Sequence, residues 1–327
     1  MFDQCQSVAN LSYDWCFRQS GLRSLHTLLL AALTFPNAGQ IVALLFAIVL
    51  LSASIAAWAG LLIRAQLTGA IGLDWCDEPR ADWTRFPERT VLALALVLIC
   101  MHLLSKLAPP QSELNDAKPV QVRHPDLDSN RKPGPPEPAA LTTGRLVSNI
   151  VFTGGLAAVL VAILSCSQRS LADYGLKWPS LGWQVVDGVY GYLLSLIPMA
   201  ALMFATSPFR GPHNQNALLT LLAESPDLGT VAAICFAAVI LAPLYEELLF
   251  RVVLQGWLGT VVDARYAIPI VALIFGAIHG LPDGIALLPL AGVLGYVFHR
   301  RHSYVSVLVI HGLFNATMLI LALLIQK

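Results

Sequence analysis

Residues 41–63 form an apolar run without a single charged residue. A helix needs about 20 mostly apolar residues to cross a bilayer, where each unpaired backbone group costs several kcal/mol. Similar but partly shorter stretches follow at residues 91–104, 146–166, 183–206, 229–257, 267–281, 284–298 and 305–325. The sequence therefore predicts an all-α, polytopic bundle of about eight transmembrane helices, placed by default in the cell inner membrane.

Composition agrees with this fold class. Hydrophobic residues make up 56% of the chain and charged residues 12%, whereas soluble domains carry about 25% charged residues. The 20 basic and 20 acidic residues cancel, so no basic field predicts nucleic-acid binding. The six cysteines include no C-x-x-C pair, which predicts neither a disulfide framework nor a zinc finger.

A polar, Pro-rich segment divides the chain. Residues 107–145 contain eight prolines and lose the apolar pattern, which predicts a flexible linker. Residues 1–106 then form an N-terminal module with two spans and an interfacial helix at residues 25–35. Residues 146–327 form a six-helix core. Within that core, Pro198, Pro243 and Pro289 are tolerable if neighbouring helices bond the carbonyl groups that proline leaves free.

Charged groups inside the predicted spans are few and clustered, which is typical of functional sites in membranes. Glu247 and Arg251 stand four residues apart, in the favourable order for an ion pair on one helix face. Glu246 points about 100° away from Glu247 and is left without that partner. We therefore expect a structural role for the pair and a functional one for Glu246.

Two later helices carry the remaining polar groups. His279 ends the span at residues 267–281, and His311 and Asn315 lie four residues apart in the last span, on one helix face. A helical rise of about 1.5 Å per residue puts Glu246, His279 and Asn315 at similar depths. The sequence thus predicts one cavity near the membrane midplane that these groups share.

The motifs E-E-x-x-x-R, F-x-x-x-H and H-x-x-x-N, in this order, resemble those of the CPBP intramembrane proteases. This family includes type II CAAX prenyl endopeptidases and bacteriocin-processing, immunity-type and abortive-infection-like proteins. The resemblance covers residues 183–325, with the Gly292–Gly295 helix and the Arg301-x-Ser303 turn. It implies catalytic roles for Glu246, His279, His311 and Asn315, with Glu247, Arg251 and Phe275 in support.

The resemblance implies an endopeptidase that acts on a membrane-associated peptide or protein, with a prenylated CAAX or leader-type substrate and the lipid bilayer as its partners. In the favoured route no cofactor is needed: Glu246 and His279 activate a water, and His311 and Asn315 donate to the oxyanion. In the alternative, Glu246, His279 and His311 bind zinc. Asn315 favours the first route, because it is a poor zinc ligand. The rival class is a transporter or inactive scaffold.

Overall fold

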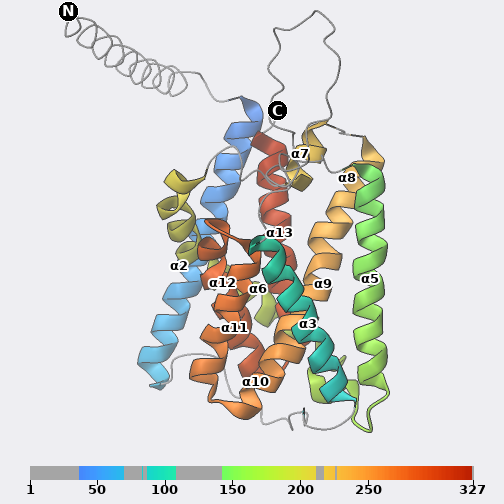
Figure 1. Cartoon of the computed structure of the whole chain (residues 1–327). Coiled ribbons are helices and arrows are strands. Elements are labelled where there is room, and N and C mark those ends of the chain that lie inside the picture. Colours follow the sequence, from blue (N-terminus) through green and yellow to red (C-terminus); the bar gives the residue numbers. More distant parts are fainter. Residues whose placement is uncertain are drawn as a thin grey trace, which may run out of the picture. The chain divides into compact units, whose positions relative to one another are not determined.

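The computed structural model describes residues 37–69, 83, 87–107, 142–210, 217–224 and 227–325, and all regular structure in these ranges is helical (Figure 1). The predicted interfacial helix and residues 108–141 of the predicted linker lie outside the described part. Two compact units are distinguished, one of residues 1–46 with 324–327 and one of residues 47–323. The longer helices are α2 (Ala38–Thr68), α3 (Glu88–Leu107), α5 (Thr143–Ser165), α6 (Leu181–Ala205), α11 (Ala264–His279), α12 (Asp283–Arg301) and α13 (Tyr304–Ile325).

Five helical segments are long and apolar enough to cross a membrane: α2, α5, α6, α13 and the segment Leu228–Val261. α11 is apolar but shorter. α3 and α12 form over two more of the predicted stretches, but Glu88, Arg89 and Lys106 in α3, and Asp283 and the basic end of α12, reduce their apolar character. The predicted count of eight spans is therefore not confirmed. The chain is nevertheless a multi-pass integral membrane protein with an all-helical fold.

The outer faces of the spans are apolar, as lipid contact requires. Val151 and Phe152 of α5 are 69% and 67% exposed, and Leu62 of α2 is 59% exposed. A water-soluble protein rarely leaves so many large apolar side chains in contact with solvent. Trp178 and Trp183 beside the start of α6 are also exposed, in the position expected for interfacial anchors.

The segment Leu228–Val261 changes its helical geometry along its length. It consists of α8 (Leu228–Cys235), the π-helix η4 (Phe236–Leu241), α9 (Ala242–Glu247), the π-helix η5 (Leu248–Gln255) and α10 (Gly256–Val261). Asp227 begins it as an N-cap, and its side chain accepts from the Thr230 backbone N–H. A π-helix turn is wider than an α-helical turn and often marks a functional site. Here two such segments flank the six residues that carry both glutamates.

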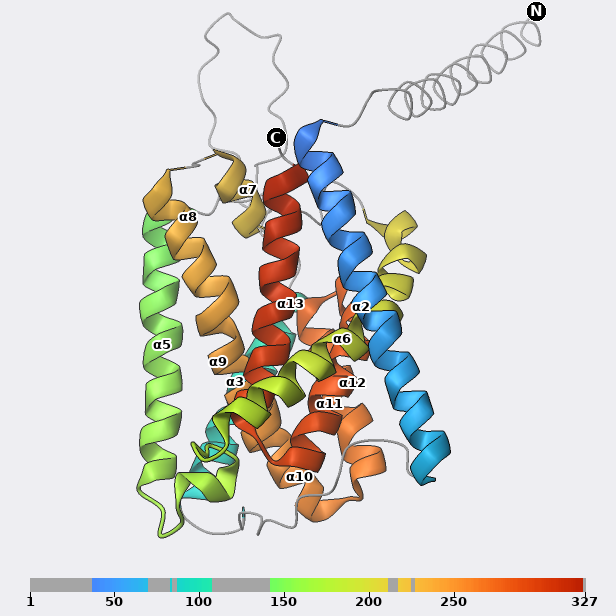
Figure 2. The ribbon, with the colours of Figure 1, turned by 180° about the vertical axis from the view of Figure 1, so that it is seen from behind.

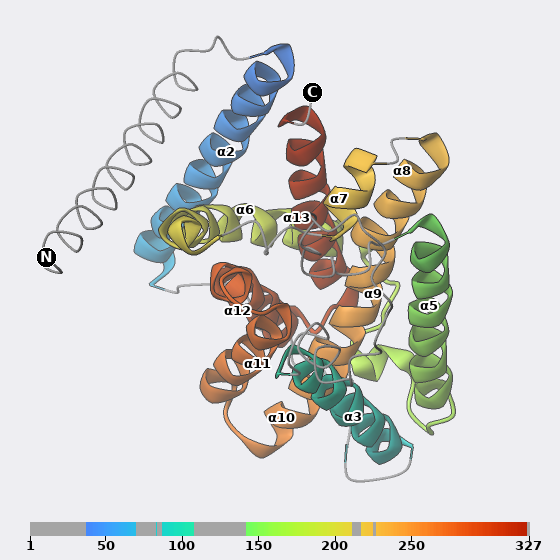
Figure 3. The ribbon, with the colours of Figure 1, turned by 45° about the horizontal axis from the view of Figure 1, so that its top comes forward.

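Small residues let the core helices approach closely. A methyl group added to Gly284 of α12 would lie 2.1 Å from the Gly276 carbonyl oxygen of α11. A methyl on Gly188 of α6 would lie 2.6 Å from the Val309 side chain of α13. α6 runs obliquely across α13, as Figures 2 and 3 show. Backbone contact of this kind, permitted by glycine, is the usual way for membrane helices to pack without a hydrophobic driving force.

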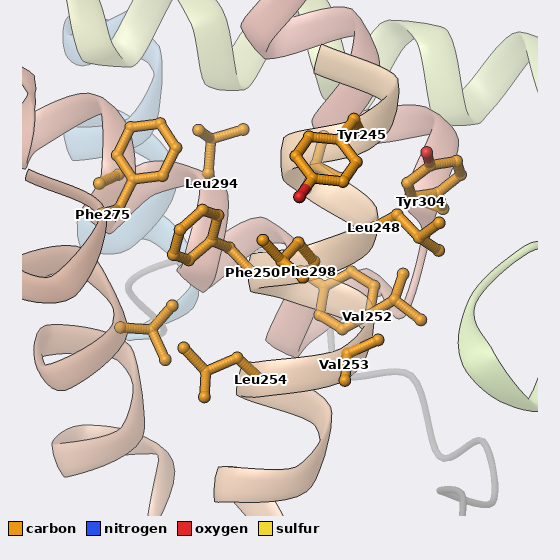
Figure 4. Packing of buried hydrophobic residues seen from close by; sticks show 14 of the residues in the cluster. Tyr245, Leu248, Phe250, Val252, Val253, Leu254, Phe275, Leu294, Phe298 and Tyr304 are labelled. Atoms are coloured by element: carbon orange, nitrogen blue, oxygen red, sulfur yellow. The ribbon is translucent and has the colours of Figure 1, made fainter. Parts of the chain in front are cut away.

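The interior beneath the site is a cluster of apolar side chains from several helices. Phe250 and Leu254 of η5, Phe275 of α11 and Leu294 and Phe298 of α12 are among its buried members (Figure 4). The Phe250 and Phe275 rings meet edge to face, with their centroids 5.2 Å apart. This packing fixes α9, α11 and α12 relative to one another, and so fixes the polar groups that they carry.

Candidate active site

Glu246 and Glu247 leave α9 in different directions, as the helical geometry requires. Glu247 is fully buried, whereas the Glu246 side chain is 21% exposed. The two carboxylates therefore have different environments and different partners.

The buried carboxylate belongs to a three-residue network. Glu247 Oε2 accepts from Arg251 Nε at 2.9 Å, which forms the predicted ion pair, and both side chains are fully buried. Glu247 Oε1 lies 2.7 Å from His311 Nδ1 of α13. The Arg251 guanidinium also lies over the Phe275 ring, 5.1 Å from its centroid, a favourable position for a cation. This network ties η5 to α11 and α13.

His279, the last residue of α11, is held from two sides. Its Nδ1 lies 2.7 Å from the Phe275 carbonyl oxygen, and its ring lies against the Phe275 ring with centroids 4.6 Å apart. The Phe275 ring also meets the His311 ring edge on, at 5.9 Å. Phe275 is thus in contact with both histidines and with Arg251.

Glu246 faces both histidines. Its Oε2 atom lies 3.9 Å from His279 Nε2 and 3.9 Å from His311 Nε2. This separation is too long for a direct hydrogen bond and suits one water molecule that bridges the groups. The His279 side chain is 28% exposed and that of His311 only 4%. The Glu246 and His279 side chains are thus partly exposed, although the Glu246 Oε2 atom itself is buried, and the cluster is closed behind His311.

The Nδ1 contacts fix where the protons lie on both rings. A carbonyl oxygen can only accept, and so can a carboxylate that is paired with an arginine. Both histidines therefore carry a proton on Nδ1, and in their neutral form both direct an Nε2 lone pair toward Glu246. Protonation of either ring would turn that Nε2 into a donor.

Asn315 has a partner that the sequence did not predict. Its Nδ2 donates to the Ala238 carbonyl oxygen in η4 at 2.7 Å. In this π-helix the Ala242 N–H bonds the Ala237 carbonyl, five residues earlier. The corresponding donor for Ala238 would be residue 243, which is a proline and has no N–H. Asn315 thus supplies the bond that Pro243 cannot make, and its second N–H remains available.

A tyrosine that sequence reasoning missed holds the same segment from the other end. Tyr304, the first residue of α13, donates its hydroxyl to the Leu244 carbonyl of α9. α13 therefore contacts the carboxylate-bearing segment through Tyr304, His311 and Asn315. A polar residue at the start of an apolar span gives no sequence signal for such a bond, because interfacial tyrosines are common.

Residues 228–317 match the family model described as type II CAAX prenyl endopeptidase Rce1-like. This part of the chain is therefore similar to a family of membrane proteases. The match includes all three motifs and so covers Glu246, Glu247, Arg251, Phe275, His279, His311 and Asn315. None of the curated proteins and none of the solved structures matches the chain significantly.

The family resemblance raised zinc as an alternative, and the donor types suit it. Two Nε2 atoms and a carboxylate are common zinc ligands, and both rings are oriented through Nδ1 as in many metal-bound histidines. Their spacing is wider than a zinc shell requires. Within the described ranges, no group of three or more His, Cys, Asp or Glu residues has the geometry to hold a metal ion. The site thus fits zinc by chemistry and not by spacing.

Proposed function

We propose that the protein is an intramembrane endopeptidase that hydrolyses peptide bonds of membrane-associated substrates, with Glu246 as the general base. The observation that carries this proposal is the equal 3.9 Å distance from Glu246 Oε2 to the Nε2 atoms of His279 and His311. One water at hydrogen-bond distance from all three groups would be held and polarised at a single point. Similarity of residues 228–317 to a membrane protease family supports peptidase activity in general.

The proposed reaction begins when the bridging water attacks the scissile carbonyl carbon. Glu246 takes one proton from the water, and the neutral His279 Nε2 accepts a hydrogen bond from the other. The carbonyl oxygen becomes an oxyanion as the carbon–oxygen bond of the new carboxyl group forms. Glu246 then returns its proton to the amide nitrogen, and the carbon–nitrogen bond breaks to release the amine.

The charges around His311 favour the protonated form of its imidazole ring. Glu246 and Glu247 carry two negative charges, and Arg251 supplies one positive charge in their immediate surroundings. A protonated His311 would balance the second, since unbalanced charge is costly in a low-dielectric interior. In that state His311 Nε2 is a donor for the oxyanion, and the free N–H of Asn315 is a second candidate.

The open side of the cluster indicates where a substrate approaches. Glu246 and His279 are partly exposed, whereas His311, Glu247 and Arg251 are buried. We propose that a peptide from a membrane-associated protein enters on this side, with a prenylated CAAX terminus or a leader-type peptide as the substrate class. The family description supports the CAAX class, because it names prenyl endopeptidases.

A reconstituted cleavage assay tests this function. Purified protein in liposomes receives farnesylated C-terminal peptides, their unprenylated counterparts and leader-type peptides, and the products are identified by mass spectrometry. Cleavage that depends on Glu246 supports the proposal and ranks the substrate classes. Failure to cleave any of them, together with proton or solute flux across the liposomes, would support a transporter instead.

A further inference from the structure

Three successive carbonyl groups in α6 receive side-chain hydrogen bonds just before Pro198. Tyr192 accepts from Ser195 Oγ at 2.7 Å, Leu193 from Ser54 Oγ at 2.5 Å, and Leu194 from Trp58 Nε1 at 3.1 Å. The Leu194 carbonyl is the one that the N–H of residue 198 would bond in an α-helix. Proline has no N–H, and its ring also crowds that carbonyl.

Two of these donors come from α2, a helix outside the six-helix core that the sequence predicts. Ser54 is fully buried, and α2 lies beside α6 in both Figure 2 and Figure 3. A third bond crosses the same interface in the opposite direction, from the Tyr190 hydroxyl to the Ala57 carbonyl at 3.0 Å. Ser54 and Trp58 lie near the middle of the 31-residue helix α2, where the bilayer offers no water to replace a missing bond.

α6 in turn packs against the part of α13 that carries His311. A methyl group on Gly191 would lie 2.7 Å from the Ile310 side chain, immediately before His311. The Tyr192 hydroxyl bonds the Thr317 hydroxyl two residues beyond Asn315. The part of α6 whose carbonyl groups accept hydrogen bonds from α2 is therefore also the part that packs against α13 beside His311 and Asn315.

We propose that Trp58, with Ser54, is a positioning residue. Its indole N–H bonds the Leu194 carbonyl that Pro198 leaves without a backbone donor. This bond holds α6 in place, and through α6 it holds His311 and Asn315 of α13 in position relative to Glu246. α2 is then a functional part of the enzyme and not a separate module. The effect on turnover rests on the proposed peptidase function, whereas the coupling between Trp58 and Pro198 does not depend on it.

A double-mutant cycle between Trp58 and Pro198 tests the coupling. Trp58→Phe removes the donor and keeps an aromatic ring, and Pro198→Ala restores the N–H that the Leu194 carbonyl lacks. We expect Trp58→Phe to lower the ratio of folded to unfolded protein in mild detergent about tenfold in the native background. In the Pro198→Ala background the same change should alter the ratio less than about twofold. Equal effects in both backgrounds would overturn the inference.

Two controls separate this bond from general packing. Trp183→Phe makes the same substitution at a side chain that is 74% exposed, and it should change the folded ratio little. Tyr190→Phe removes a bond across the same interface. Its acceptor, the Ala57 carbonyl, also has an ordinary helical donor, because residue 61 is leucine and carries a backbone N–H. Trp58→Phe should therefore be the more damaging change. If Pro198→Ala does not fold, this comparison still decides: a Tyr190→Phe effect as large as that of Trp58→Phe would overturn the inference.

Turnover provides the readout of positioning. At a temperature where Trp58→Phe is fully folded, we expect kcat to fall at least tenfold with KM nearly unchanged. In the Pro198→Ala background, the addition of Trp58→Phe should leave kcat nearly unchanged. Full turnover in folded Trp58→Phe would refute the positioning role. If the native protein cleaves nothing, the proposed function fails, while the stability cycle still tests the bond between α2 and α6.

Discussion

His311 Nδ1 lies 2.7 Å from Glu247 Oε1, while the other oxygen of the same carboxylate accepts from Arg251. One buried carboxylate thus orients an imidazole on α13 and neutralises a guanidinium on η5. Glu247 and Arg251 therefore contribute to stability and also to the direction of the His311 Nε2 atom. These two contributions can be separated by substitution.

Removal of one member of the buried pair should reduce folding as well as activity. Glu247→Ala leaves the Arg251 charge unpaired, and Arg251→Ala leaves Glu247 unpaired, each at a cost of about 3–5 kcal/mol. We expect a low yield of monodisperse protein from both variants by size-exclusion chromatography. The double variant Glu247→Leu/Arg251→Met should recover yield, because it replaces the pair with apolar groups, but not activity, because His311 loses its acceptor. Normal yield of the single variants would argue against a structural pair.

Glu246→Gln should abolish proteolysis and leave the fold intact. Glutamine preserves the volume and hydrogen bonding of the side chain but cannot accept the water's proton. We expect at least a 1,000-fold loss of turnover, on the order of the effect of removing a central catalytic group, with an unchanged melting temperature. Asp283→Asn, an equivalent change at a more exposed carboxylate that pairs with Arg210, is the matched control. Native turnover in Glu246→Gln would eliminate Glu246 as the base.

Asn315 has two candidate roles, a structural bond to Ala238 and stabilisation of the oxyanion, and a substitution of Pro243 can distinguish them. Asn315→Ala should lower stability by roughly 1–3 kcal/mol, because the Ala238 carbonyl loses its donor, and should lower turnover about 100-fold to 1,000-fold if Asn315 also stabilises the oxyanion. Pro243→Ala returns a backbone N–H to that carbonyl. In the double variant stability should recover while turnover stays low. Recovery of turnover as well would limit Asn315 to its structural bond.

Prolonged chelation should leave the purified protein active and without stoichiometric metal by elemental analysis, if Glu246 and His279 alone activate the water. A zinc enzyme would lose activity on chelation and regain it when metal is returned. Reversible inactivation, together with a mild Asn315→Ala phenotype, would assign Glu246, His279 and His311 as metal ligands instead.

The Tyr174–Glu88 contact predicts a loss of stability at alkaline pH. The Tyr174 hydroxyl donates to Glu88 Oε1 at 2.6 Å, and burial, followed by this bond, raises the pKa of Tyr174 to about 12, from 10.0. The unfolded chain loses this proton first as pH rises. The stabilisation is therefore complete below pH 10 and is lost between about pH 10 and pH 12. Thermal unfolding across this range should show a smaller decline for Tyr174→Phe, which starts roughly 1 kcal/mol less stable.

The sequence predicted the parts of the site that depend on helical spacing. Glu247 and Arg251 form an ion pair, and Glu246, His279 and His311 converge from three helices. It could not predict the two π-helices, because a widened turn leaves the apolar pattern of a span almost unchanged. It also anticipated that neighbours would bond the carbonyls left free by Pro198 and Pro243, but not that Trp58 and Asn315 are the donors, since this depends on which helices become neighbours.

The wide π-helical turn before α9 sets the direction in which the carboxylates of α9 point. A π-helical turn holds about one residue more than an α-helical turn for nearly the same rotation. If Phe236–Leu241 tightened to an α-helix with its present number of residues, everything on one side would rotate by about 100° relative to the other. Glu246 and Glu247 could then not face the two histidines while Asn315 kept its bond to Ala238. The residues of η4, although entirely apolar, thus determine the orientation of the carboxylates through their number and their helical geometry, and an inserted residue there should be tolerated far less than a substitution.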